Sequence, residues 1–195
     1  VPIVALGGAS IYAAAKWESA FAGVRKTVDA TEPQLQKLGE GFQKMSERIP
    51  VSANDLAEIG AEAGALGIKT KNILGFTRVV ADLGEATDMT GLQAAESFAR
   101  FANITGMPQT QFSRLGSTVV DLGNKMAATE SEIAAMGLRI AGAGNQVGMS
   151  EHQIMAFAAG LSSVGINAEA GGTAISQSFL KMNTAVLSGS KELKT

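Results

Sequence analysis

The sequence has no cysteine in 195 residues, only four prolines and one histidine, and aromatic residues make up 5% of it. Without cysteine the chain has no disulfide framework, no thiolate nucleophile and no zinc site built on sulfur. It also lacks an excess of charge, because sixteen basic residues against eighteen acidic residues give a net charge of −2. The composition therefore gives no sign of the basic surface that binding to nucleic acid or to a membrane surface requires.

Residues that carry chemistry are scarce. His152, in SEHQIMAF, follows a candidate helix start at Ser150 and lies on the side of the helix away from Ile154 and Phe157, so we expect an exposed side chain. The chain has no Ser-His-Asp order, no HExxH and no P-loop. The glycine-rich GAGNQVG at 142–148 follows a helix and not a strand, which favours an interhelix turn over a phosphate loop. We expect that the protein is not an enzyme, uses no cofactor and has no metal site.

Long hydrophobic runs are also missing, apart from the first fifteen residues, VPIVALGGASIYAAA. These apolar or small residues before Lys16 fall short of the roughly 20 that span a bilayer. No basic region precedes them, as a signal peptide requires. We interpret residues 1–15 as an apolar segment at a cut end of a longer chain. It is either an ordinary buried helix or loop, which we favour, or a truncated membrane-active segment. Residues 188–195 are expected to begin a linker or a further helix.

Helical periodicity is what the sequence has in abundance. Eight segments carry apolar residues at i, i+3, i+7 and i+10 or a close variant of this spacing, and a ninth fits loosely, whereas none alternates over the length of a strand. This pattern predicts an all-α protein made of short amphipathic helices. The clearest members of the expected packing stripes are Ile73, Phe76, Phe112, Leu115, Ile154, Phe157 and Leu161.

The expected helix ends carry recognisable capping residues. Hydroxyl side chains that can accept hydrogen bonds from free amides at helix starts belong to Ser52, Thr90, Thr129 and Ser150. Glycines that are each followed by an apolar residue, the signature of a Schellman cap, are Gly67, Gly106 and Gly165. The AEAGG segment predicts a further turn and a close-packing point at Gly171 and Gly172.

These landmarks recur at fixed distances. A shift of 39 residues carries Gly67 onto Gly106, and a shift of 98 residues carries Ser52 onto Ser150. The repeating unit is interpreted as a helical hairpin of about 39 residues, and residues 16–187 as an array of such hairpins. One hairpin is too small to fold alone, so the hairpins must stack on one another or on copies of the chain. Small residues expected to let a second copy approach are Ala57, Ala61, Gly116, Ala158 and Ala159.

Several of these stretches, in this order, resemble the core region of phage tail tape measure proteins. The most specific are GINAEAGGTAI at 165–175, the LGN and ATESEI run at 122–133, and Trp17 with Phe21 and Val24. The resemblance covers roughly residues 16–187. Single helices of this composition are common, whereas the ordered series of them is specific.

The resemblance implies a structural protein of the bacteriophage virion. Tape measure proteins occupy the tail lumen in a few parallel copies, set tail-tube length during viral tail assembly, and leave the tube at DNA ejection. It implies a homo-oligomer, with a trimer as the favoured count, and tail tube, tail tip and tail assembly chaperone proteins as partners. No specific nucleic acid is implied, and contact with a host membrane would use other parts of the parent chain. The expected location is the virion tail lumen, and the host cytoplasm during assembly.

Two other classes of protein remain open from the sequence. A soluble helical-repeat protein-binding module would use the same hairpins as a curved solenoid. A membrane-inserting helical protein is a weaker alternative, based on the apolar N-terminal stretch and the small-residue helices.

Overall fold

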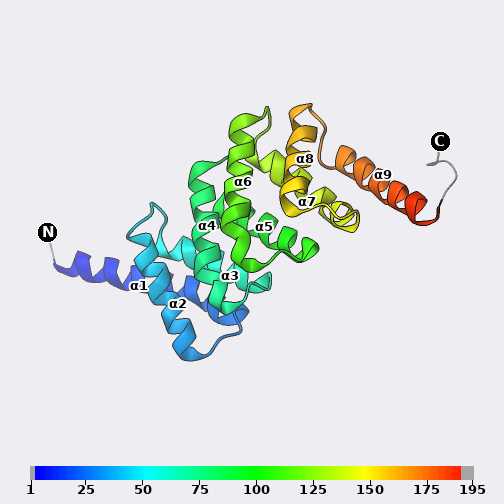
Figure 1. The fold of residues 1–195 in the computed structure, drawn as a ribbon. Coiled ribbons are helices and arrows are strands. Elements are labelled where there is room, and N and C mark those ends of the chain that lie inside the picture. Colours follow the sequence, from blue (N-terminus) through cyan, green and yellow to red (C-terminus); the bar gives the residue numbers. More distant parts are fainter. Residues whose placement is uncertain (1–2, 190–195) are drawn as a thin grey trace. The chain divides into compact units, whose positions relative to one another are not determined.

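The computed structural model describes the backbone of residues 3–189, and the side chains of Tyr12 and of residues 14–189. Within this part of the chain the secondary structure consists of nine α-helices and two short 3-10 helices, with no strand (Figure 1). The expected all-α fold is confirmed. The α-helices are α1 Ile3–Thr27, α2 Glu32–Ser46, α3 Ala53–Ala65, α4 Ile73–Ala86, α5 Gly91–Thr105, α6 Phe112–Lys125, α7 Glu130–Gln146, α8 Glu151–Ser163 and α9 Ala170–Leu187.

The first helix contains most of the apolar N-terminal segment. Helix α1 continues without a break past Lys16, so the expected segment boundary at residue 15 falls inside one element. The two 3-10 helices, Thr70–Asn72 and Gln109–Gln111, lead directly into α4 and α6. No helix in the described part of the chain is both long and apolar enough to cross a membrane.

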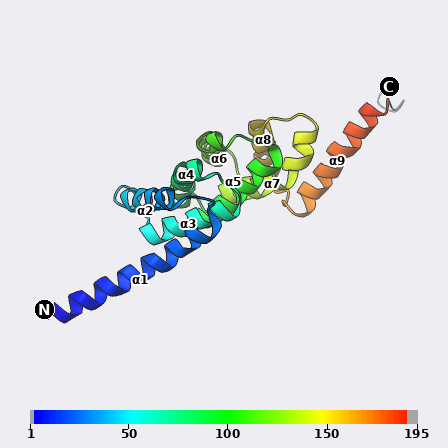
Figure 2. The same cartoon turned by 90° about the horizontal axis from the view of Figure 1, so that it is seen from below.

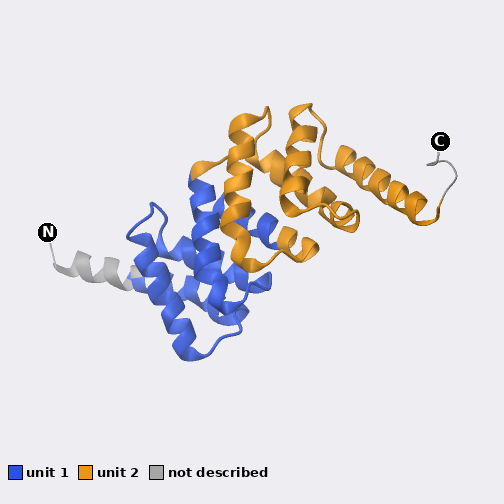
Figure 3. Ribbon diagram, viewed as in Figure 1, with its two compact units in different colours: residues 1–85, 90–99 blue, residues 86–89, 100–195 orange. Residues whose placement is uncertain are grey.

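The chain forms two compact units (Figure 3), a division that the sequence analysis did not predict. Unit 1 consists of residues 1–85 and 90–99, and unit 2 of residues 86–89 and 100–195. Helix α5 contributes to both units, because the boundary between them falls within it.

Unit 1 is built around α3, which packs against α1 and α2. The largest side chains of its core have less than 2% of their surface exposed. Burial of side chains of this size contributes roughly 1.5 to 3 kcal/mol each. The contact between α2 and α3 is close, since a Cβ atom at Gly60 would overlap the ring of Phe42. The largest buried side chains of unit 1 are Phe42, Leu56, Ile73, Phe76 and Phe98.

Unit 2 is built around α7, which packs against α6, α8 and α9. Helices α7 and α8 approach closely at Gly137, where a Cβ atom would lie 2.6 Å from the sulfur of Met155. The largest buried side chains of unit 2 are Phe101, Leu115, Ile133, Met136, Ile140, Ile154 and Met155.

The sequence spacings recur as equal helices. A shift of 39 residues carries α4 onto α6, and both helices have 14 residues. A shift of 98 residues carries α3 onto α8, and both have 13 residues. Packing within the units also joins helices two places apart in the chain, α1 with α3 in unit 1, and α6 with α8 and α7 with α9 in unit 2. The pairing of consecutive helices as 39-residue hairpins stays a prediction.

Candidate assembly surface

The four hydroxyl residues expected at helix starts lie immediately before a helix. Ser52 accepts a hydrogen bond from the amide of Asp55 at 3.2 Å. Thr90, Thr129 and Ser150 each accept from the amide three residues later, and the side chain at that later position accepts from their own amide. These reciprocal bonds satisfy amides that the helix leaves free, and so fix where α3, α5, α7 and α8 begin.

The three glycines expected at helix ends have left-handed backbones, with φ of +83° at Gly67, +74° at Gly106 and +79° at Gly165. Their following residues donate to carbonyls five positions back, as in Ile68 to Ala63 at 2.9 Å. Gly148 has the same geometry, with φ of +81°, and its signal is the same glycine followed by an apolar residue. The expected turn at 142–148 is therefore shorter, because α7 continues to Gln146.

The turn expected at Gly171 and Gly172 is wrong, because both residues belong to the first turn of α9. The chain turns earlier, where the side chain of Asn167 accepts from the amides of Glu169 and Ala170. Gly172 is buried against α7, and a Cβ atom there would lie 2.7 Å from Cγ of Arg139. The glycine permits close packing of two helices and not a change of chain direction.

The expected packing stripes fit α4 and α6, where Ile73, Phe76, Phe112 and Leu115 are buried. In α8 the stripe is correct for Ile154, which is buried, and wrong for Phe157 and Leu161. In α8 the buried residues are Ile154, Met155, Ala158 and Ala159. Phe157 remains 37% exposed, and Leu161 is only half-buried. The small alanines face the neighbouring helices because they allow close packing, and this turns the larger Phe157 outward.

The small residues expected to contact a second copy are used inside the chain, so that expectation is also wrong. Ala57, Ala158 and Ala159 have no exposed surface, and Gly116 is buried. Ala61 lies beside Gly23 of α1, where an added Cβ atom would lie 3.2 Å from that of Ala61.

Exposed apolar side chains gather instead on α8 and α9. The rings of Phe157 and Phe179 are in contact, with centroids 5.4 Å apart. Beyond them, Met182 is 50% exposed, Val186 65% and Leu187 78%. We call these five residues the α9 apolar face. Burial of such side chains against a partner is favourable, because it removes apolar surface from water.

The packing of α9 explains why this face is uncovered. Contacts of α9 with α7 are made near its start, where Gly172 lies against Arg139 and the hydroxyl of Ser176 donates to the carbonyl of Arg139 at 3.2 Å. The C-terminal half of α9 extends past the other helices of unit 2 (Figure 2). Its apolar spacing of i, i+4, i+7 and i+11 nevertheless continues from Ile175 to Val186. This is the spacing of a helix that packs along a second helix.

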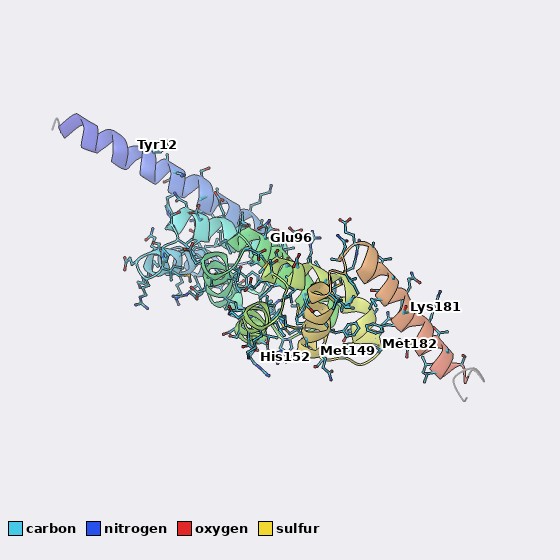
Figure 4. The ribbon with its side chains drawn as sticks, turned by 90° about the horizontal axis from the view of Figure 1, so that it is seen from above. Tyr12, Glu96, Met149, His152, Lys181 and Met182 are labelled. Carbon is cyan, nitrogen blue, oxygen red and sulfur yellow. The ribbon has the colours of Figure 1, made fainter. Side chains whose placement is uncertain are left out.

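Charge does not oppose contact between copies at this face. Lys181 is the single charged residue of α9, and it lies next to Met182 in the sequence (Figure 4). Successive residues of a helix point about 100° apart, so the side chain of Lys181 points away from that of Met182. The side chains that flank the apolar spacing, Ser176, Ser178, Asn183 and Ala185, are uncharged.

A separate polar contact joins the loop before α5 to the start of α7 within unit 2. A carboxylate oxygen of Asp88 accepts from the amide of Ser131 at 2.9 Å, and the other accepts from its hydroxyl. Desolvation by burial raises the pKa of Asp88, but hydrogen bonds from Ser131 and Thr129 outweigh it and hold the pKa below its ordinary value. The contact stabilises the unit and offers no chemistry. The described residues include no group of three His, Cys, Asp or Glu side chains placed to bind a metal ion.

His152 differs from its expected exposure, since it is half-buried and its Nδ1 lies 3.0 Å from the hydroxyl of Thr118 in α6. The difference arises because α8 packs on α6. The periodicity of one helix gives no information about such a neighbour.

Comparison with known proteins identifies one family. The family model described as phage-related minor tail protein matches residues 39–195, which include α3 to α9 and part of α2. No curated protein and no solved structure matches the chain.

Proposed function

The chain belongs to the phage-related minor tail proteins, and on that premise we propose that it is a folded module of a tail tape measure protein. A phage tail protein associates with other proteins of the virion tail. The finer proposal is that the parent chain sets the length of the tail tube during assembly and leaves the lumen at DNA ejection. In this role the chain is a structural protein and not an enzyme, and it needs no cofactor.

The family match over residues 39–195 is the observation that carries this proposal. The stretches that resemble tape measure proteins also have defined places in the fold. GINAEAGGTAI, residues 165–175, forms the connection from α8 to α9 and the first residues of α9. ATESEI, residues 128–133, contains the capping box of α7. Trp17 and Phe21 are stacked in α1, with centroids 5.3 Å apart.

In the proposal, the measuring role belongs to other segments of the parent chain. A continuous helix adds about 1.5 Å per residue to the length of a protein. The longest helix described here has 25 residues, and the others fold back into two units with buried cores. In the proposal, this module anchors the assembly, and extended helical segments elsewhere measure the tube.

The partners in the proposal are other copies of the chain and the tube, tip and chaperone proteins of the tail. The α9 apolar face is the candidate contact between copies, since it is exposed and free of charge along its apolar spacing. Three copies is the count favoured by the resemblance to tape measure proteins. The proposed location is the tail lumen, and the host cytoplasm before assembly.

In-frame deletions in the parent gene test the function. Deletions in helical segments outside residues 1–195 should shorten the tail by about 1.5 Å per residue removed, measured by negative-stain electron microscopy. Replacement of the same segments by equally long helical sequence is the control and should restore the length. A tail of unchanged length in all deletion mutants would refute the tape measure proposal.

A second candidate is a helical-repeat module that binds another protein. The observation in its favour is the packing of helices two places apart, which is typical of layered helical repeats. This function also predicts tails of normal length in the deletion mutants, with a defect in recruiting one tail component.

A further inference from the structure

A shallow polar hollow lies between α6 and α8 of unit 2. It has a volume of about 390 Å³ and is lined by Ser113, Arg114, Ser117, Thr118 and His152. Four of these side chains come from the first two turns of α6. His152, which is labelled in Figure 4, comes from the first turn of α8. Three hydroxyls, one guanidinium and one imidazole therefore line the same hollow, and no carboxylate lines it.

The hydrogen bonds of Thr118 indicate which ring nitrogen of His152 faces it as a donor. Its hydroxyl donates to the carbonyl of Arg114 at 2.9 Å, and the same oxygen lies 3.0 Å from Nδ1 of His152. A carbonyl can only accept, and a hydroxyl has one proton to give. Both bonds are therefore made at once when Nδ1 of His152 carries the ring proton and donates to Thr118. This holds the imidazole ring in place at the edge of the hollow, with Nε2 as an acceptor in that tautomer.

Arg114 is the cation of the hollow. Among the described residues its guanidinium has no hydrogen-bond or ion-pair partner, whereas Arg78 of α4 is paired with Asp82 at 2.7 Å. A guanidinium presents a planar set of donors that matches two oxygens of one phosphate or carboxylate. The positive ends of the helix dipoles at the starts of α6 and α8 add positive potential near the hollow.

The repeat indicates that the helix itself does not require these polar side chains. A shift of 39 residues places Leu74, Gly75 and Val79 of α4 at the positions of Ser113, Arg114 and Thr118 in α6. Both helices have the same length, and both bury their apolar residues. Formation of the helix or of its core therefore does not require the polar side chains of Ser113, Arg114 and Thr118.

We propose that this hollow binds a phosphate group. Arg114 contacts two of the phosphate oxygens, and the hydroxyls of Ser113 and Ser117 donate to the others. Thr118 holds the ring of His152 beside the ligand, where the ring reports binding. The ligand is either free phosphate or the phosphate of a nucleic-acid backbone, which share this chemistry. The proposal does not depend on the tape measure role.

Inorganic phosphate is the first probe, because His152 is the only histidine and its ring gives one set of NMR signals. Ring-nitrogen shifts are followed during a phosphate titration of the whole chain, at fixed pH and with ionic strength held constant by sodium chloride. We expect a saturable shift. Constant ionic strength is essential, since general screening would otherwise imitate binding.

Two substitutions locate the site, and one serves as the matched control. Arg114→Gln should weaken phosphate binding at least tenfold, and Ser117→Ala, at an exposed position, about threefold to tenfold, because each removes donors to the anion. Arg78→Gln is the control, because it also removes one positive charge but lies in α4, 39 residues before Ser117. It should leave the phosphate affinity within twofold of that of the unmodified chain. Circular dichroism checks that each variant keeps its helices.

A short single-stranded oligonucleotide distinguishes the two sources of phosphate. Tighter binding than inorganic phosphate, lost in Arg114→Gln, assigns the site to a nucleic-acid backbone, and weaker binding assigns it to free phosphate. A shift that stays linear with phosphate would overturn the proposal. Equal losses in Arg114→Gln and Arg78→Gln would also overturn it, because they would mark non-specific attraction.

Discussion

The ring of Phe157 in α8 lies against the ring of Phe179 in α9, and this pair begins an apolar face that the rest of unit 2 does not cover. Aromatic contacts of this kind contribute about 0.5 to 1.5 kcal/mol beyond the burial of their area. The pair holds the first part of α9 on the unit. The residues that follow on the same helix, Met182 and Val186, remain at least half exposed.

The first prediction is that the α9 apolar face mediates self-association. Val186→Glu should raise the dissociation constant between copies at least tenfold, because it places like charges opposite each other in an apolar contact. Lys181→Gln, on the same helix but outside the face, should have little effect. Light scattering over a hundredfold concentration range measures both variants against the unmodified chain. An unmodified chain that stays monomeric at every concentration would rule out this contact.

The ends of the helices are predictable from the sequence because they are decided locally. The helix starts at Ser52 and Thr129 depend on a side chain and an amide three residues apart, and the ends at Gly67 and Gly165 depend on a backbone angle that glycine adopts easily. Such signals are complete within a few residues. They therefore place helices without any knowledge of the neighbouring helices.

The residues that form the candidate surface could not be predicted in the same way. Periodicity alone predicts that Phe157 is a core residue. The structure instead buries Met155 and Ala158 of α8, because they pack against α7 at Gly137. Which face of a helix is buried depends on the neighbouring helix, and that information is distant in the sequence. The half-buried position of His152 and the division into two units have the same origin.

The second prediction concerns the left-handed glycines. Gly67→Ala should destabilise unit 1 by about 1 kcal/mol, because an alanine side chain disfavours φ of +83° although no atom lies within 4 Å of its Cβ position. Gly75→Ala in α4 also meets open space but has helical φ, and should stabilise by about 0.5 to 1 kcal/mol. Urea denaturation followed by circular dichroism compares the two. A gain in stability at Gly67 would contradict the cap.

The third prediction concerns acid stability and Asp88. Because its pKa is lower in the folded chain, the carboxylate stabilises unit 2 fully above the ordinary aspartate pKa of about 4. That contribution is lost as the pH falls from there through the lowered folded pKa. In Asp88→Asn the free energy of unfolding should therefore decrease less steeply below about pH 4 than in the unmodified chain, since an amide does not titrate.

The control for this prediction is Asp121→Asn, which removes a carboxylate paired only with Lys125 on the surface of α6. Surface pairs of this type contribute little. Thermal unfolding between about pH 2 and pH 7 measures both variants. If both variants change the acid dependence equally, the bonds from Ser131 do not determine the acid stability.

The last prediction uses two threonines of unit 1 whose hydroxyls have opposite surroundings. The hydroxyl of Thr77 is fully buried and has no hydrogen-bond partner. The hydroxyl of Thr27 lies 2.7 Å from the carbonyl of Ala61 and 3.1 Å from that of Gly23, so it ties α1 to α3. Valine has nearly the same shape as threonine without the hydroxyl. Thr77→Val should therefore stabilise unit 1 by about 1 kcal/mol, since an unsatisfied buried polar group costs about 1 to 3 kcal/mol.

Thr27→Val is the matched control and should destabilise by about 1 kcal/mol, because it removes the hydroxyl of α1 that donates to the carbonyl of Ala61 in α3. Both changes are measured as free energies of unfolding in urea under one set of conditions, so the helix propensity of valine enters both values alike. A loss of stability in Thr77→Val as large as that in Thr27→Val would mean that the Thr77 hydroxyl has a partner in solution, such as a buried water molecule.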